Sequence, residues 1–327
     1  MSMKISTSDF AIAENKAYTK DIPIKKVVRA RGGEIEILDK CKVLGLVKRR
    51  SPNSHKGTFG KLVCITGSDR FPGAAQISAL SALRSGVGLV QVITTRSCAI
   101  ALTSSIKEAT LLPLDSGKDG FITSSEYALQ QIESAISSAT AVLIGCGLGN
   151  TDDTLRILEL VIEKSNCPII IDADGINALA TRIELLRKAK TDIILTPHPA
   201  ELARLCSADT RDVCKNRYEY AKKLCCEYSV TVVAKSASTL VLSPSNGFLS
   251  LYGNDGLAKG GSGDMLAGLI GSFSAQGYSP TDAAKLGVVI QGVACEKVSK
   301  RLSKTGMLAS DVIDCLPSLF KNFERLR

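Results

Sequence analysis

The sequence predicts an α/β fold, a three-layer α/β/α sandwich around a mostly parallel central sheet. Two patterns predict it. Short runs made almost entirely of apolar residues alternate with longer segments of helical periodicity, and such runs are typical of strands buried on both faces. The order strand, glycine turn, helix, strand over residues 62–94 is also that of a right-handed parallel crossover.

Each element follows from a local pattern. Residues 1–35 have weak periodicity and a glycine pair near their end, so we expect an N-terminal extension of uncertain order there and one domain over 36–327. A short helix is expected over 35–47, and a helix rich in small residues follows the segment 72–75 and ends at Arg84. Buried strands are predicted at 62–66, 89–94, 142–144, 169–171, 193–195 and 230–234, and a hairpin at 239–242 and 248–251. The other helices are predicted at 125–138, 154–164, 175–179, 199–205, 213–228, 262–276 and 281–302.

The composition excludes several classes of partner. Lysine and arginine outnumber aspartate and glutamate by 41 to 32, which suits anionic ligands. Aromatic residues are only 5% of the chain and do not interleave with basic ones, so no nucleic acid is expected. No run has the length of a membrane span, and no signal-peptide core is visible. Eleven cysteines without a C-x-x-C pair argue against zinc and for reduced thiols, so we expect a cytoplasmic protein.

A glycine-rich turn before the predicted helix 262–276 is the most informative segment for function. Gly260, Gly261 and Gly263 allow positive φ and present backbone amides at a helix N-terminus, where a phosphate can bind without a lysine. Asp264 is unexpected in such an anion site. It could take a proton from a hydroxyl that attacks the phosphate, or it could simply cap the helix. The residues alone leave both interpretations open.

Small or polar loops follow five of the predicted strands. They begin at Gly67, Gly145, Asp172, Thr196 and Lys235. Because ligands bind beyond the carboxyl ends of parallel strands, we expect these loops to form one site. Asp172 and Asp174 could serve Mg²⁺, although helix capping is the favoured interpretation. His198, between two prolines, is either a structural histidine or a ligand contact.

Six ordered motifs resemble those of the ATP/ADP-dependent NAD(P)H-hydrate dehydratases, which belong to the ribokinase-like superfamily. The motifs lie at 55–60, 72–75, 145–149, 172–174, 196–201 and 259–264. The resemblance covers about residues 50–320, and six motifs in order are far more specific than any one of them. No segment of the chain resembles the N-terminal epimerase domain that many relatives carry.

The resemblance implies an enzyme of metabolite repair. It implies dehydration of (6S)-NADHX or NADPHX back to NADH or NADPH, with ATP or ADP as co-substrate and with Mg²⁺. In the family's scheme the ring hydroxyl is phosphorylated and then leaves as phosphate, expelled by the lone pair of the ring nitrogen. Because members of the family commonly assemble into multimers, tetramers included, a homo-oligomer is expected.

The resemblance also implies roles for individual residues. Asp264 would be the catalytic base, and it would contact the hydrate together with Ala74, Gly147 and His198. The nucleotide-binding residues would be Lys235, Ser236, Ala237, Ser238, Thr239 and Gly263. No metal ligand is assigned. Three positions depart from the family pattern, since Cys146, Ser236 and Gln291 stand where proline, glycine and histidine are frequent.

Two other functions stay open at this point. A kinase of small-molecule hydroxyls, from the same superfamily, would share the glycine turn and Asp264. A non-catalytic nucleotide sensor would keep the fold without turnover. The loops at His198 and at 145–149 match the dehydratases better than the kinases, and the presence of Asp264 argues against a sensor.

Overall fold

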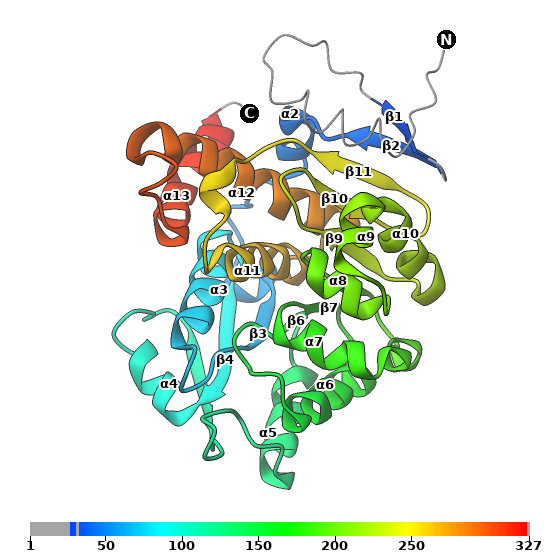
Figure 1. Ribbon diagram of the computed structural model, residues 1–327. Helices are drawn as coiled ribbons and strands as arrows, with labels where there is room; N and C mark the ends of the chain where they lie inside the picture. Colours follow the sequence, from blue (N-terminus) through cyan, green and yellow to red (C-terminus); the bar gives the residue numbers. More distant parts are fainter. Residues whose placement is uncertain (1–26, 31–32, 326–327) are drawn as a thin grey trace.

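The computed structural model describes residues 27–30 and 33–325 (Figure 1). Within them, eleven strands form one sheet in the order β1-β2-β11-β10-β9-β8-β7-β6-β3-β4-β5. Their bounds are β1 Val27–Ala30, β2 Gly33–Ile37, β3 Lys61–Ile65, β4 Leu89–Thr95, β5 Thr110–Leu114, β6 Ala141–Ile144, β7 Ile169–Ile171, β8 Ile193–Leu195, β9 Thr231–Ala234, β10 Thr239–Leu242 and β11 Gly247–Ser250. All pairs from β9 to β5 are parallel, and β10 is antiparallel to both neighbours. The mostly parallel sheet is therefore confirmed.

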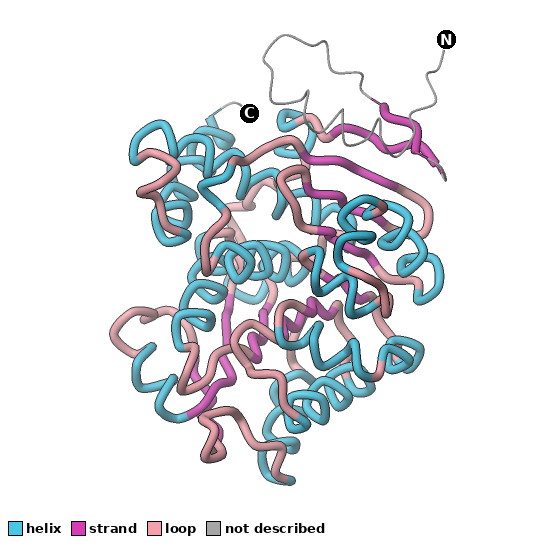
Figure 2. Tube along the Cα trace, in the orientation of Figure 1, coloured by secondary structure: helices cyan, strands magenta, loops and turns pink. Residues whose placement is uncertain are grey.

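Helices cover both faces of this sheet, as Figure 2 shows with cyan helices around magenta strands. One face carries α2 Lys40–Leu44, α3 Pro72–Arg84, α4 Arg96–Leu102, α11 Ser262–Ala275, α12 Pro280–Leu302 and α13 Ala309–Arg325. The other carries α5 Glu126–Ser137, α6 Asp152–Lys164, α7 Asp174–Thr181, α8 Pro199–Leu205, α9 Thr210–Lys215 and α10 Arg217–Tyr228. The predicted three-layer sandwich is confirmed.

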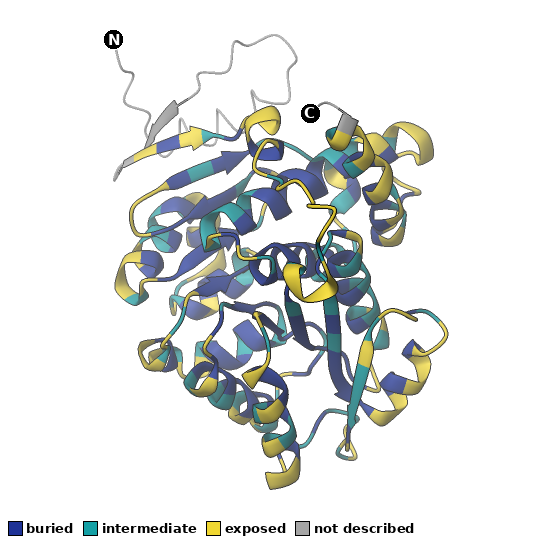
Figure 3. Ribbon diagram, turned by 180° about the vertical axis from the view of Figure 1, so that it is seen from behind, coloured by how far each residue is buried: buried dark blue, intermediate teal, exposed yellow. Residues whose placement is uncertain are grey.

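The central strands supply both hydrophobic cores, because successive side chains point to opposite faces. Leu143 and Ile170 pack in the core beneath α11 and α12, whereas Ile144 and Ile171 pack in the core beneath α5 to α8. All four side chains are fully buried. Figure 3 shows the same arrangement, with a dark blue sheet inside and exposed yellow positions on the outer helices.

The prediction of a helix over 35–47 is wrong in its first part. Ile35 belongs to β2, where it pairs with Val28, and the helix begins only at Lys40. The alternation Glu34, Ile35, Glu36 has the period of a strand, with the isoleucine fully buried and both glutamates exposed. Strand β2 also lies across the boundary between the predicted extension and the predicted domain, while residues 1–26 lie outside the described part of the chain.

Other departures concern helices. The predicted helix 213–228 is two helices that meet at Asn216, where α9 ends and α10 begins. Helices α4 and α13 and strand β5 were not predicted. All eleven cysteines have free thiols. In the described ranges, no helix is at once long and apolar enough to cross a membrane.

Candidate active site

The five loops that follow β3, β6, β7, β8 and β9 meet at one edge of the sheet, as expected. The Gly67 amide donates to the Cys146 carbonyl at 2.7 Å, and the Lys235 amide donates to the Pro197 carbonyl at 2.9 Å. Between these pairs, a Cβ added to Gly145 would lie 1.9 Å from the Asp172 carbonyl, so the loops after β6 and β7 are in backbone contact. The five loops thus form one continuous surface.

The glycine turn leads into α11 without a side-chain cap. Gly261 occupies the cap position with φ 87°, a left-handed conformation that glycine adopts readily, and the helix has no side-chain cap hydrogen bond. Asp264 lies in that first turn and is half-buried. The capping interpretation of Asp264 is therefore wrong, and the N-terminal amides of a 14-residue helix are left for an anion.

The environment of Asp264 favours its protonated form. Burial and the neighbouring charge of Asp172 raise the pKa of Asp264 to about 6, while the Cys146 thiol and Lys235 act in the opposite direction. A carboxyl group with such a pKa can still be ionised at neutral pH, and it is more basic than an ordinary aspartate. This combination suits a general base.

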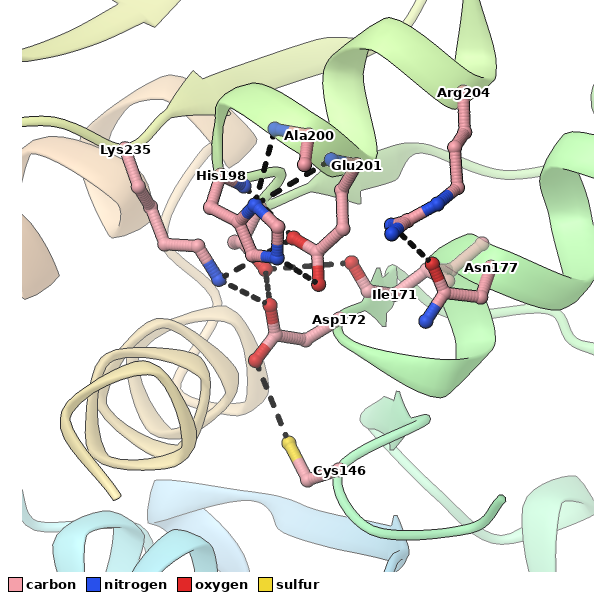
Figure 4. A network of polar contacts seen from close by, with 10 residues as sticks. Cys146, Ile171, Asp172, Asn177, His198, Ala200, Glu201, Arg204 and Lys235 are labelled. Carbon is pink, nitrogen blue, oxygen red and sulfur yellow. Dashed lines mark hydrogen bonds and ion pairs between the residues drawn. The ribbon is translucent and has the colours of Figure 1, made fainter. Parts of the chain in front are cut away.

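Asp172, at the carboxyl end of β7, is the centre of the polar network in Figure 4. One of its oxygens accepts hydrogen bonds from Lys235 Nζ at 2.8 Å and from Thr196 Oγ1 at 2.6 Å, and the other lies 3.6 Å from Cys146 Sγ. Burial opposes the charge of Asp172, but Lys235 and Thr196 outweigh it and hold the pKa of Asp172 below its usual value. Burial likewise opposes the charge of Lys235, yet Asp172 and Glu201 keep its pKa above the usual value. The pair is therefore ionised.

The prediction that Asp172 or Asp174 caps α7 is wrong. The cap position is Ala173, with φ 48°, and no side chain caps the helix. Asp172 instead bonds residues of other loops, and an oxygen of Asp174 accepts the Gly149 amide at 2.8 Å. The two carboxylates hold neighbouring loops together.

His198 is a structural residue with one accessible side. Its Nδ1 accepts the Ala200 and Glu201 amides at 3.1 and 3.4 Å and so caps α8. Because an accepting Nδ1 carries no proton, the proton sits on Nε2, which lies 3.3 Å from Glu201 Oε1. Burial first, and then the charges of Lys235 and Arg204, lower the pKa of His198. Since 47% of its side chain is exposed, a ligand can still touch the ring.

Glu201 is a site residue to which the sequence assigned no role. Its Oε2 accepts the His198 amide at 2.7 Å, and its side chain is only 5% exposed. Burial, opposed by Lys235, raises the pKa of Glu201 to about 7. The spacing of three residues between His198 and Glu201, directly before an apolar helix, is a capping-box signal that could have revealed this pair.

The residues predicted to contact the hydrate lie on neighbouring loops, since Cys146, next to Gly147, is within 4.8 Å of Asp264. Ala74 and Gly147 lie together, since a Cβ added to Gly147 would be 2.8 Å from the Cβ atoms of Ala74 and Phe71. Asp264 and His198 are brought together through Lys235 and Asp172 rather than by a direct bond. Gln291, a departure from the family pattern, donates to the Ser262 carbonyl at 2.7 Å and so holds the first residue of α11.

The residues predicted to bind nucleotide only partly converge. Lys235 and Gly263 do, because a Cβ added to Gly263 would lie 3.4 Å from Lys235 Nζ. Ser236 and Ala237 are exposed in the turn that follows β9, Thr239 is half-buried, and Ser238 is buried. The Ser238 carbonyl accepts a bond from Arg217 at 2.7 Å.

One group of side chains could hold a metal ion. Single donor atoms of Cys146, Asp172 and Asp264 lie within 4.8 Å of one another. The two carboxylates suit a hard cation such as Mg²⁺, whereas the thiol does not. Lys235 binds one oxygen of Asp172 and the Cys146 thiol the other, so an ion held by Asp172 and Asp264 would replace the thiol contact.

The fold and the uncapped glycine turn define a ribokinase-like protein with a turn of the kind that binds phosphate. A solved ribokinase-like protein of Enterococcus faecalis has the same fold, with a TM-score of 0.78 at 23% identity over 93% of this chain and 99% of that one. The family model for NAD(P)H-hydrate dehydratase matches residues 62–318, and the chain belongs to this family.

Individual relatives agree with this assignment. The chain is 32% identical over 283 residues to the ADP-dependent (S)-NAD(P)H-hydrate dehydratase of Bacillus subtilis, covering 86% of this chain and 96% of that protein. A crystal structure of the Bacillus subtilis ADP/ATP-dependent dehydratase, co-crystallised with ATP and Mg²⁺, has a TM-score of 0.78 at 30% identity, over 90% of this chain and all of that one. The bifunctional NAD(P)H-hydrate repair enzyme of Moorella thermoacetica is 31% identical over 277 residues, which are 84% of this chain and 52% of that protein. The chain thus spans about half the length of such bifunctional relatives.

Proposed function

We propose that this protein dehydrates (6S)-NADHX and NADPHX to NADH and NADPH at the expense of a nucleotide, with Asp264 as the catalytic base. The observation that carries the proposal is the placement of Asp264. It lies in the uncapped first turn of α11, half-buried, with a pKa raised by burial to about 6. A base therefore adjoins backbone amides that can stabilise negative charge on a phosphoryl group.

The chemistry explains why a dehydratase uses a kinase-like site. Hydroxide is a poor leaving group near neutral pH, whereas phosphate is a good one. Asp264 takes the proton of the ring hydroxyl while the hydroxyl oxygen attacks the terminal phosphorus of the nucleotide, whose bond to the leaving nucleotide breaks. The lone pair of the ring nitrogen then expels phosphate. Loss of a proton from the neighbouring ring carbon restores the dihydronicotinamide, so the net change is loss of water and hydrolysis of the nucleotide.

ATP or ADP and Mg²⁺ are proposed as co-substrate and cofactor, because the Bacillus subtilis relatives are named for those nucleotides and were crystallised with ATP and Mg²⁺. When bound, Mg²⁺ would neutralise part of the negative charge of the phosphates. The carboxylates of Asp264 and Asp172 would be the groups to hold it. Lys235, Gly263 and the exposed turn 236–237 would contact the nucleotide, and Ala74, Gly147 and the exposed ring of His198 the hydrate.

Two further properties belong to this proposal. The free thiols of all eleven cysteines suit a reducing compartment, so we place the activity in the cytoplasm. A homo-oligomer, tetramers included, stays a prediction that size-exclusion chromatography with light scattering would test. A small-molecule kinase is the second candidate function, because the same base and turn would serve it.

The decisive experiment supplies hydrated NADH and either ATP or ADP and follows the absorbance of the dihydronicotinamide. We expect absorbance to return with one phosphate released per NADH formed. Asp264→Asn should lower turnover by about a thousandfold or more while binding of both substrates persists, because the charge is lost and the shape is kept.

Asp282→Asn provides a matched control, since Asp282 forms an ion pair with Lys285 at the start of α12, outside the site. Nucleotide consumption that leaves a stable phosphorylated product would favour the kinase. Unchanged turnover in Asp264→Asn would exclude Asp264 as the base.

A further inference from the structure

We propose that Asp172 is a positioning residue that fixes the ammonium group of Lys235 beneath the first turn of α11, where it meets the phosphates of the nucleotide. The inference rests on the proposed function only in naming the ligand. The placement itself follows from the contacts of Asp172, a residue to which neither the sequence motifs nor the relatives assign this role.

The first step is the rigidity of Asp172. The side chain is 2% exposed, and it lies at the end of β7 in the middle of the sheet. Thr196 Oγ1, from the loop after β8, donates to the same oxygen that receives Lys235. Thr196 follows β8, next to β7, and Lys235 follows β9, one strand further. Because both partners are held by the sheet, the carboxylate is fixed and in turn fixes Lys235.

The second step is the free-energy cost of burying the Lys235 ammonium group without this partner. Its side chain is only 18% exposed, and a buried ammonium needs a counter-charge to stay in place. Two carboxylates are available, Asp172 at 2.8 Å and Glu201 at 3.8 Å. Only Asp172 is within hydrogen-bond distance of Lys235 Nζ, so Asp172 is the principal anchor.

The third step is the position of Lys235 relative to α11. A Cβ added to Gly263 would lie 3.4 Å from Lys235 Nζ and 3.7 Å from an Asp172 oxygen. Both charged groups therefore touch the turn whose amides face the site. A phosphoryl group on that turn would meet a fixed cation together with the amides, and a fixed cation stabilises developing charge without reorganisation.

The test is a double-mutant cycle on ATP binding, measured by calorimetry without the hydrate and without Mg²⁺, because Asp172 is also a candidate Mg²⁺ ligand. Asp172→Asn and Lys235→Met should each weaken ATP binding about tenfold, and the double variant should bind no more than about threefold worse than Lys235→Met alone, because both changes remove one interaction. If the double variant instead lost ATP affinity by the product of the two single losses, the two residues would act independently and the proposal would be overturned. So would an Asp172→Asn variant with normal affinity.

Kinetics separate positioning from a merely structural role. In Asp172→Asn we expect the KM for ATP to rise and kcat to fall about a hundredfold, with the KM for hydrated NADH unchanged. A variant that merely folds less completely would have a lower apparent kcat with both KM values unchanged. That result would contradict the proposal. Asp282→Asn is the matched control, because it breaks a half-buried Asp–Lys pair of 2.6 Å outside the site.

Two variants keep the test informative if Asp172→Asn does not fold. The double variant removes both buried charges, so its folding does not depend on the ion pair. Thr196→Val keeps the pair but removes a hydrogen bond of 2.6 Å to Asp172, and it should weaken ATP binding by a smaller factor. Because ATP binding is measured without the hydrate, failure of this cycle and failure of the dehydratase assay are distinguishable.

Discussion

At the scale of residues, the ion pair between Asp172 and Lys235 is the central contact of the site. Asp264 and Gly263 were identified because the glycine turn and the helix after it are contiguous. Asp172 was assigned to helix capping because its partner Lys235 is 63 residues away and joins it only when β7 and β9 lie in one sheet. The contact between His198 and Glu201 could have been predicted from the sequence, since their capping box is local. Long-range ion pairs are the part of a site that local patterns do not encode.

The pKa of Asp264, raised to about 6 by burial and by Asp172, leads to a prediction at the same scale. A base works only when ionised, so kcat/KM should fall as the pH drops through about 6, not near 4 as for an exposed aspartate. The measurement is a pH profile of kcat/KM for hydrated NADH at saturating ATP. Binding of ATP measured over the same pH range is the control, and an acid limb near pH 4 would contradict the assignment.

At the scale of elements, the buried strands and most helices were predicted, because each is defined by its own periodicity. Each failure has its own cause. Asn216 separates α9 from α10 without a glycine or proline to mark the break. Helix α13 contains Pro317, a residue that argues against a helix in any local reading. Ile35 was placed in a helix because its strand depends on pairing with residues of β1 and β11.

Helix α11 offers a prediction that separates stability from binding. Gly263→Ala should leave the fold intact or stabilise it by about 0.4–1 kcal/mol, because alanine restricts the unfolded chain and its methyl would make ordinary contacts with Lys235 and Asp172. The same methyl occupies the space of a phosphate, so ATP affinity should fall about tenfold, or 1.4 kcal/mol.

Thermal unfolding and calorimetry on the same sample test this. Gly73→Ala is the matched control, since Gly73 has the same place in α3 and open space around it. Normal ATP affinity in Gly263→Ala would show that the turn is not the phosphate site.

At the scale of the whole molecule, the site forms because the sheet places loops from distant parts of the chain next to one another. Its loops follow β3, β6, β7, β8 and β9, which span residues 61–234, and α11 closes it from a later segment. The sequence indicated that the loops would meet, since the rule for parallel strands is general. It could not give their contacts, which depend on strand order. The single domain predicted over 36–327 stays a prediction.

The pairing of β2 with β11 has a consequence for shortening the chain. Strand β2 lies parallel to β11, the Leu38 amide donates to the Leu249 carbonyl at 2.8 Å, and Ile35 is fully buried. Removing residues 1–38 would leave the backbone groups of β11 as an open edge, and open edges recruit other strands. We expect the shortened protein to aggregate, which light scattering would detect. A shortened protein that scatters no more light than the full chain would show that the open edge has no effect. The hydrogen bonds between β2 and β11 therefore limit how much of the N-terminus can be removed, and this limit lies well before residue 62, where the match to the family model begins.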